Sequence, residues 1–148
     1  MINSALPVAK ISEQRPDQQI LRSLKSGGAA TEFTGLQRRL VEMPADSQGW
    51  YLLSLAASGL DDRSGERLWI ERALTVEPTS AHILTSLGIA KLQDQNIYGS
   101  YRAFSTAIQH RPNFAPARYN RALIDLEAMN FARGWLDYEW RFEYPSAP

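Results

Sequence analysis

The side chains that could perform acid–base, nucleophilic or metal chemistry are few and scattered along the chain. There is no cysteine, which excludes disulfides and Cys-ligated zinc or iron–sulfur sites. The two histidines, His82 and His110, lie far apart in the sequence. His110 falls at the end of a predicted helix, where a partial positive charge suits the helix dipole. We interpret His110 as a structural or solvated residue and His82 as a plain surface residue, with contact to a ligand as the alternative for His82.

The carboxylates lie beside basic residues at helical spacing and do not converge on one another. Asp137 is four residues from both Arg133 and Arg141, and Arg67 is four residues from Glu71. Pairs at this spacing are typical of surface ion pairs on helices, worth about 0.3–0.5 kcal/mol each. The sequence also has no metal-site spacing, Gly-rich phosphate loop or nucleophile elbow. We therefore expect no catalytic residue, no metal, no cofactor and no enzyme activity.

Composition and charge indicate which classes of partner the chain is not expected to bind. The chain has 148 residues, of which 44% are hydrophobic, with 16 basic and 16 acidic residues. This neutral balance gives no electrostatic reason to expect nucleic acid or an anionic membrane as partner. The N-terminus has no apolar run long enough for a signal peptide, and no stretch approaches the roughly 20 apolar residues of a membrane span. We expect a cytoplasmic protein that binds neither nucleic acid nor membrane.

A period of about 34 residues organises most of the chain and is typical of two short amphipathic helices per unit. A small residue midway along the first helix lets the second pack close. A proline ends the second helix, since it cannot continue the hydrogen-bond ladder. One helix pair cannot bury its apolar face alone, so the pairs must stack. Residues that share the period are Pro44, Pro78 and Pro112; Leu36, Ile70, Phe104 and Tyr138; Leu40, Leu74, Ile108 and Phe142; and Ser54, Gly88 and Ala122.

The unit 81–114 resembles the tetratricopeptide repeat (TPR) family, through Leu87-Gly88, Ser100, Phe104, Ala107 and Pro112. Unit 47–80 follows the pattern less closely, and unit 115–148 departs from it at Arg118, Arg121 and Arg141. The resemblance implies an all-α helix-turn-helix solenoid, a right-handed superhelix of three to four repeats. We expect helices at 17–25, 29–42, 48–59, 63–76, 81–93, 97–110, 115–128 and 131–143. The expected organisation is a mobile arm at 1–15, a degenerate helical pair at 16–46 and an array of three pairs at 47–145.

The resemblance also implies where a partner would bind, because the first helix of each pair lines the concave groove of a TPR array. This lining is apolar and aromatic, which suits an amphipathic helix or an extended apolar peptide. We therefore expect a protein–protein interaction module, or scaffold. The alternative is that some of these residues belong to the core or are covered by the N-terminal arm. Carried over by position, the groove residues are Tyr51, Leu55, His82, Thr85, Ile89, Leu92, Tyr119, Asn120 and Leu123.

The C-terminal end is a second candidate surface because it is rich in aromatic residues. At helical spacing Phe131, Trp135, Tyr138 and Phe142 form one stripe, which we expect to face the core. Trp140 and Tyr144 fall off this stripe and are candidates for contact with a partner, a second copy in a homodimer, or a further domain. One alternative function is therefore an assembly protein that self-associates through this end.

The stretch 134–141, GWLDYEWR, resembles the end of TPR arrays in bacterial proteins that continue into a glycosyltransferase domain. This second resemblance implies another alternative: the chain is the N-terminal targeting domain of such an enzyme, or a relative of that domain.

Overall fold

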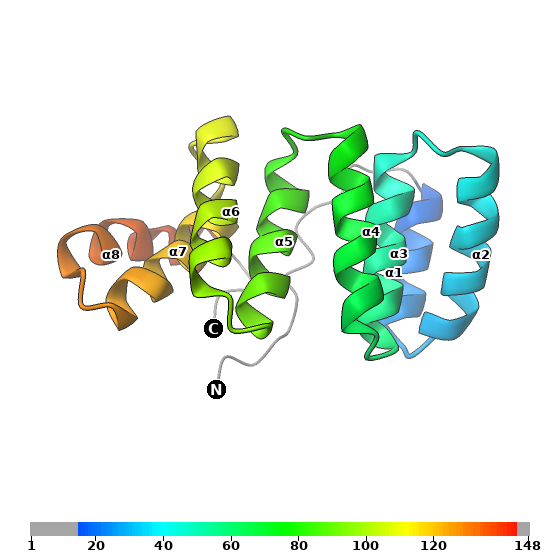
Figure 1. The fold of residues 1–148 in the computed structure, drawn as a ribbon, viewed down its shortest axis with the longest axis horizontal. Coiled ribbons are helices and arrows are strands. Elements are labelled where there is room, and N and C mark those ends of the chain that lie inside the picture. Colours follow the sequence, from blue (N-terminus) through cyan, green and yellow to red (C-terminus); the bar gives the residue numbers. More distant parts are fainter. Residues whose placement is uncertain (1–14, 145–148) are drawn as a thin grey trace. The chain divides into compact units, whose positions relative to one another are not determined.

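A computed structural model describes residues 15–144, and all of their regular structure is helical (Figure 1). The all-α prediction is thus confirmed for these residues. The first seven expected helices agree with the structure to within two residues at each end, whereas the last expected helix is divided into α8 and the 3₁₀-helix η1. The elements are α1 (Arg15–Lys25), α2 (Ala29–Glu42), α3 (Ser47–Gly59), α4 (Arg63–Val76), α5 (Ala81–Gln93), α6 (Ile97–His110), α7 (Ala115–Glu127), α8 (Phe131–Tyr138) and η1 (Glu139–Glu143).

The predicted arm at residues 1–15 lies outside the described residues, apart from Arg15, which begins α1. The same holds for residue 145, the expected end of the array. None of the described helices combines the length and apolar character that a membrane span requires.

The turns inside the helix pairs repeat as regularly as the side chains do. Asp61, Gln95 and Met129 occupy equivalent positions in successive units, and each has a positive φ of 57–59°. Gly27, one period before Asp61, has a φ of 92°. A left-handed residue just after a helix lets the chain reverse while the last carbonyls are still hydrogen-bonded. The period of the sequence is therefore also a period of backbone conformation.

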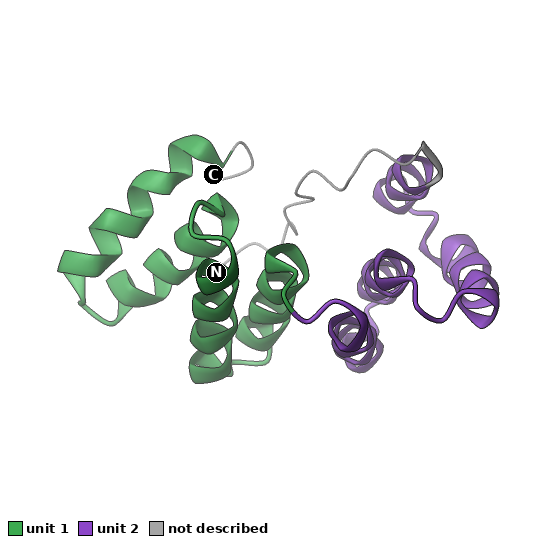
Figure 2. Cartoon of the chain, turned by 90° about the horizontal axis from the view of Figure 1, so that it is seen from above, with its two compact units in different colours: residues 1–9, 79–148 green, residues 10–78 purple. Residues whose placement is uncertain are grey.

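The described residues divide into two compact units, one ending at Pro78 and one beginning at Thr79 (Figure 2). In the first unit α3 packs against α4 and α2, and α1 contacts both α2 and α3. Trp50 of α3 stacks on Trp69 of α4, with ring centroids 5.5 Å apart. The buried core cluster of this unit is Leu36, Leu40, Leu52, Leu53 and Ala56.

In the second unit α5 pairs with α6 and α7 with α8, and α6 and α7 pack together. Gly88, midway along α5, lies so close to the fully buried Phe104 of α6 that a methyl group at Gly88 would overlap the ring. Ser100 of α6 donates a hydrogen bond to the Gly88 carbonyl at 2.8 Å. The small residue that the repeat predicts here therefore sets how closely these two helices approach.

Two buried carboxylates hold α8 against α7. Asp137 of α8 is 3% exposed and accepts hydrogen bonds from Arg118 Nη1 at 2.6 Å and from Arg121 Nε at 2.9 Å. Asp125 of α7, also 3% exposed, accepts both hydrogen bonds of a forked pair from Arg133 of α8, at 2.6 and 2.8 Å. Such bidentate pairs are short, strong and directional.

The predicted surface pairs of Asp137 with Arg133 and Arg141 are therefore wrong. Asp137 faces α7 instead of solvent, so its partners come from the neighbouring helix. Arg141 pairs with Glu139 at 2.9 Å. The two arginines of α7 that depart from the repeat, Arg118 and Arg121, are the partners of Asp137.

Replacing Gly88 by alanine should lower the free energy of unfolding by about 2 kcal/mol, because the buried Phe104 ring must shift to admit the methyl group. The matched control is Gly35→Ala in α2, where nothing lies within 4 Å of the new methyl group. That change should be neutral or stabilising by about 0.5–1 kcal/mol, the gain from replacing glycine within a helix. Urea denaturation of both variants measures the difference; equal effects would contradict the close packing at Gly88.

Removing the carboxylate in Asp137→Ala should cost about 3 kcal/mol, because Arg118 and Arg121 lose their buried counter-charge. The repeat itself supplies the control. The residues one period earlier are Leu84, Leu87 and Ala103. The triple variant Arg118→Leu, Arg121→Leu, Asp137→Ala should therefore regain much of the loss in thermal or urea denaturation. A triple variant as unstable as Asp137→Ala would argue against the ion pairs as the cause.

Candidate functional site

The first helices of the pairs in the second unit, α5 and α7, contact each other. Apart from His82, Lys91 and a few small polar residues, α5 is apolar on all sides. One part of it is buried, including Ile83 and Leu84, while Ile89 and Leu92 remain half-exposed. A helix that is apolar all round is usually covered all round. The half-exposed apolar side of α5 is thus a surface that a partner could cover.

The predicted groove residues differ widely in exposure. Tyr51 is 1% exposed, Thr85 3% and Tyr119 6%, so these three side chains offer almost no surface to a partner. Tyr51 and Leu55 belong to the first unit, where Leu55 packs against the core cluster. The remaining predicted residues are partly buried members of the second unit: His82, Ile89 and Leu92 on α5, and Asn120 and Leu123 on α7.

The polar members of this set use hydrogen-bonding capacity inside their own helices. Thr85 Oγ1 donates to the Ala81 carbonyl at 2.7 Å, and Asn120 Nδ2 donates to the Pro116 carbonyl at 2.7 Å. The surface that these helices leave open is consequently more apolar than the residue types alone indicate. Leu123 supports this, because it packs beside the buried cluster of Ala115, Tyr119 and Tyr144.

His82 is not a plain surface residue, contrary to our prediction. Its ring lies edge-on to Phe114, with centroids 6.4 Å apart, and the side chain is mostly buried. Burial, and secondarily the positive charge of Arg111, lower the pKa of His82 to about 4. The imidazole is therefore neutral at physiological pH. Its neutrality keeps this part of α5 free of charge.

Of the four rings in the predicted inward stripe, Tyr138 packs against Tyr119 with centroids 5.7 Å apart, but the other three face outward. Phe131 is 54% exposed, Trp135 56% and Phe142 71%, so these three rings do not face the core. Tyr144, expected to be off the stripe, is 6% exposed and lies edge-on to Tyr119 at 5.8 Å. The physical reason is that Asp137 and Gly134 take the side of α8 that faces α7.

Trp140, the other residue expected to be off the stripe, is also packed within the unit. The Arg118 guanidinium lies over its ring, 5.0 Å from the centroid, and the side chain joins the cluster around Tyr144. Neither Trp140 nor Tyr144 presents the free aromatic face that we expected of them. The exposed surface at this end is formed by other residues.

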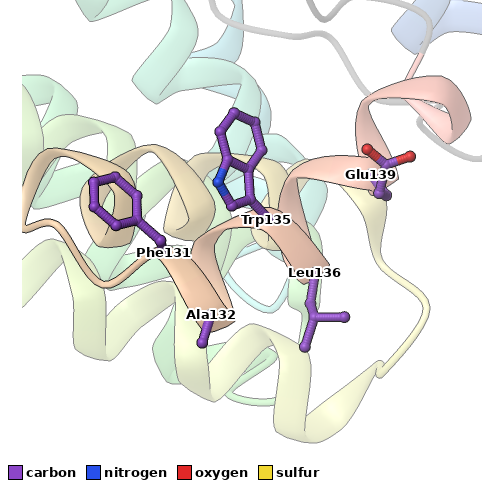
Figure 3. Close-up of a pocket in the computed structure, with 5 residues that line it drawn as sticks. All are labelled: Phe131, Ala132, Trp135, Leu136 and Glu139. Carbon is purple, nitrogen blue, oxygen red and sulfur yellow. The ribbon is translucent and has the colours of Figure 1, made fainter.

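That surface is an open pocket of about 590 Å³ along α8 (Figure 3). Phe131 and Trp135 rise on one side of the helix, and Ala132 and Leu136 lie on the other (Figure 3). Glu139, at the start of η1, is the one charged lining residue. Leu136 and Glu139 were missed by the sequence analysis. The repeat period holds a signal for Glu139, because it pairs Glu139 with Ser105, which faces the next helix pair.

Within residues 15–144 no three acidic or histidine side chains converge on a point where a metal ion could bind. The open surfaces of α5, α7 and α8 are mainly apolar, with a few charges at their edges.

No protein-family model matches the chain, and no curated protein matches it. Solved structures do. MamA, a TPR-repeat protein, is matched with a TM-score of 0.72 and 15% sequence identity over 86% of this chain and 77% of MamA. A second structure of MamA gives 0.66 and 18% over 90% of this chain and 80% of that protein.

A variant of the O-GlcNAc transferase of Thermobaculum terrenum, which carries TPR arrays, is matched with a TM-score of 0.58 and 18% identity. The match covers 76% of this chain but 23% of the transferase. At these identities the likeness shows the fold alone. It confirms the TPR-type all-α fold that the repeat period predicts.

The buried, neutral His82 should make stability depend on pH. In the unfolded chain this residue titrates near 6.5 and in the native protein near 4. Above pH 6.5 both states are neutral there and His82 contributes nothing to the pH dependence. Between pH 6.5 and 4 the unfolded state binds the proton first, so the free energy of unfolding falls by up to roughly 3 kcal/mol.

His82→Gln should lose the part of the pH dependence that comes from His82. Its free energy of unfolding in urea should therefore change less between pH 7 and 4 than that of wild type. The carboxylates and His110 are common to both proteins, so the difference isolates His82. Parallel profiles for the two proteins would contradict the lowered pKa.

Proposed function

Because the chain has a TPR-type fold, we propose that it is a protein–protein interaction module. The second unit receives an apolar segment of another protein, an amphipathic helix or an extended peptide, along α5 and α7. The chain itself performs no catalytic step and needs no cofactor or metal. It acts in the cytoplasm, bound neither to nucleic acid nor to a membrane.

The observation that carries this proposal is the half-exposed apolar side of α5, next to α7. Ile89 and Leu92 are two of the larger aliphatic side chains of α5, yet they stay partly open to solvent. Covering apolar area contributes about 25 cal/mol per Å² removed from water. A partner that buries these side chains gains that energy, and His82 adds no charge of its own to the surface because its imidazole is neutral.

A second candidate is the targeting domain of a glycosyltransferase, or a relative of that domain. It is supported by the fold likeness to the O-GlcNAc transferase and by the residues of 134–141. In that role too the chain would bind protein and leave catalysis to another domain. Glycosyl transfer by the 148-residue chain alone would therefore contradict both candidates.

Placing a charge on the apolar side of α5, in Ile89→Glu, should weaken partner binding at least tenfold, because the carboxylate would lose its water on binding. Tagged wild-type and variant chains capture proteins from the native lysate. The protein that wild type enriches is then purified, and its Kd is measured for both chains.

Two controls accompany this test. Gln109→Glu adds the same charge at an exposed position on α6 and should leave the Kd unchanged. Trp135→Ala removes the exposed ring of α8 and should also have no effect. Loss of binding with Trp135→Ala but not with Ile89→Glu would move the function to the end of the chain.

A further inference from the structure

The outward face of α8 is an apolar surface with one negative charge. Phe131, Trp135 and Leu136 are 54%, 56% and 74% exposed, and they flank the open pocket shown in Figure 3. The Glu139 side chain, at one end of this pocket, is 64% exposed. Exposed apolar area of this kind, edged by a charge, is typical of an interaction surface.

The preceding pair shows what covers the equivalent face within this protein. Tyr101 and Ser105 of α6 lie one period before Trp135 and Glu139. The guanidinium groups of Arg121 and Arg133, from the following pair, lie over the Tyr101 ring at 6.0 and 5.3 Å. Arg121 Nη1 also donates a long hydrogen bond of 3.5 Å to Ser105 Oγ. The second helix of one pair thus receives arginines from the next pair.

In the last pair the two equivalent positions, Trp135 on α8 and Glu139 at the start of η1, hold residues that bind a guanidinium more strongly. An indole ring attracts a cation better than a phenol ring does. A carboxylate accepts a stronger hydrogen bond than a hydroxyl group does. Glu139 is bonded to Arg141 at 2.9 Å, in an exposed pair of the kind that exchanges partners at little cost. Trp135 and Glu139 should therefore bind an arginine more strongly than Tyr101 and Ser105 do.

We propose that the face formed by Phe131, Trp135, Leu136 and Glu139 docks an amphipathic helix of a partner protein. The helix sets an arginine over Trp135 and against Glu139, and it lays an apolar side chain between Phe131 and Leu136. It packs on α8 as α7 packs on α6. This surface is separate from the apolar side of α5 and does not depend on the function proposed for it.

Charge complementarity selects this occupant over a second copy of the same face. The pocket lining holds a carboxylate and no cation. A symmetric pairing of two copies would bring the two Glu139 side chains toward one another, and the facing pocket lining of the other copy would supply neither of them with a cation.

The test uses the full chain and a synthetic peptide with the sequence 113–128, constrained to a helix by a side-chain staple on its solvent face. This sequence contains α7, the helix that makes the equivalent contact with α6. The peptide is titrated to 1 mM against ¹⁵N-labelled chain, and the indole N–H signal of Trp135, assigned with Trp135→Phe, reports binding. A shift of this signal is expected on adding the peptide. The Kd should be at least fivefold higher when the peptide carries Arg121→Gln.

A matched pair of chains identifies the charge contact. Glu139→Gln should weaken binding of the arginine peptide at least threefold. It should leave binding of the Arg121→Gln peptide unchanged, because only the arginine peptide can form an ion pair with Glu139. The Glu139 side chain is 64% exposed, so Glu139→Gln should not affect folding of the chain. Three results would overturn the proposal: no shift of the Trp135 signal up to 1 mM, equal binding of the two peptides, or an unliganded dimer in sedimentation analysis that Trp135→Ala converts to a monomer.

Discussion

A buried carboxylate determines how the last part of the second unit is arranged. Asp137 sits between two arginines of α7, and this contact fixes the rotation of α8 about its own axis. Once Asp137 faces inward, Trp135, two residues earlier, lies on nearly the opposite side of the helix, because successive helical residues are turned by roughly 100°. The inward side of the chain after α8 is then completed by Tyr144 against Tyr119. The exposed apolar face of α8 is a consequence of this arrangement.

The repeat period predicted the helices and the turns because it is produced by packing between neighbouring pairs, which leaves a mark at each repeat. The positions of Asp61, Gln95 and Met129 follow it even in backbone conformation. The period also explains why a small residue stands at Gly88, where Phe104 fills the space. These features depend on residue size and on chain reversal, and a single sequence records both.

The orientation of α8 could not be obtained by following aromatic residues along one helix, since the helix also carries a charged residue that pairs across the interface. Arg118, Arg121 and Asp137 each replace an apolar residue of the preceding repeat, so each one taken alone makes the match to the repeat pattern poorer. Viewed together they replace an apolar contact by an ionic one. For the groove, residue type could not predict exposure, because the burial of Tyr51, Thr85 and Tyr119 depends on how neighbouring helices approach.

The stacked indoles of Trp50 and Trp69, 5.5 Å apart and inclined by 16°, have an optical consequence. The electronic transitions of two indoles at this distance couple to each other. The first unit should therefore give an exciton signal in circular dichroism, and this signal reports on the first unit because both indoles belong to it. The other two tryptophans, Trp135 and Trp140, lie in the second unit. Each unit thus carries its own pair of tryptophans. In arrays of helix pairs, cooperativity between neighbours decides whether the whole unfolds as one. Here the two halves can be followed separately, without adding a probe.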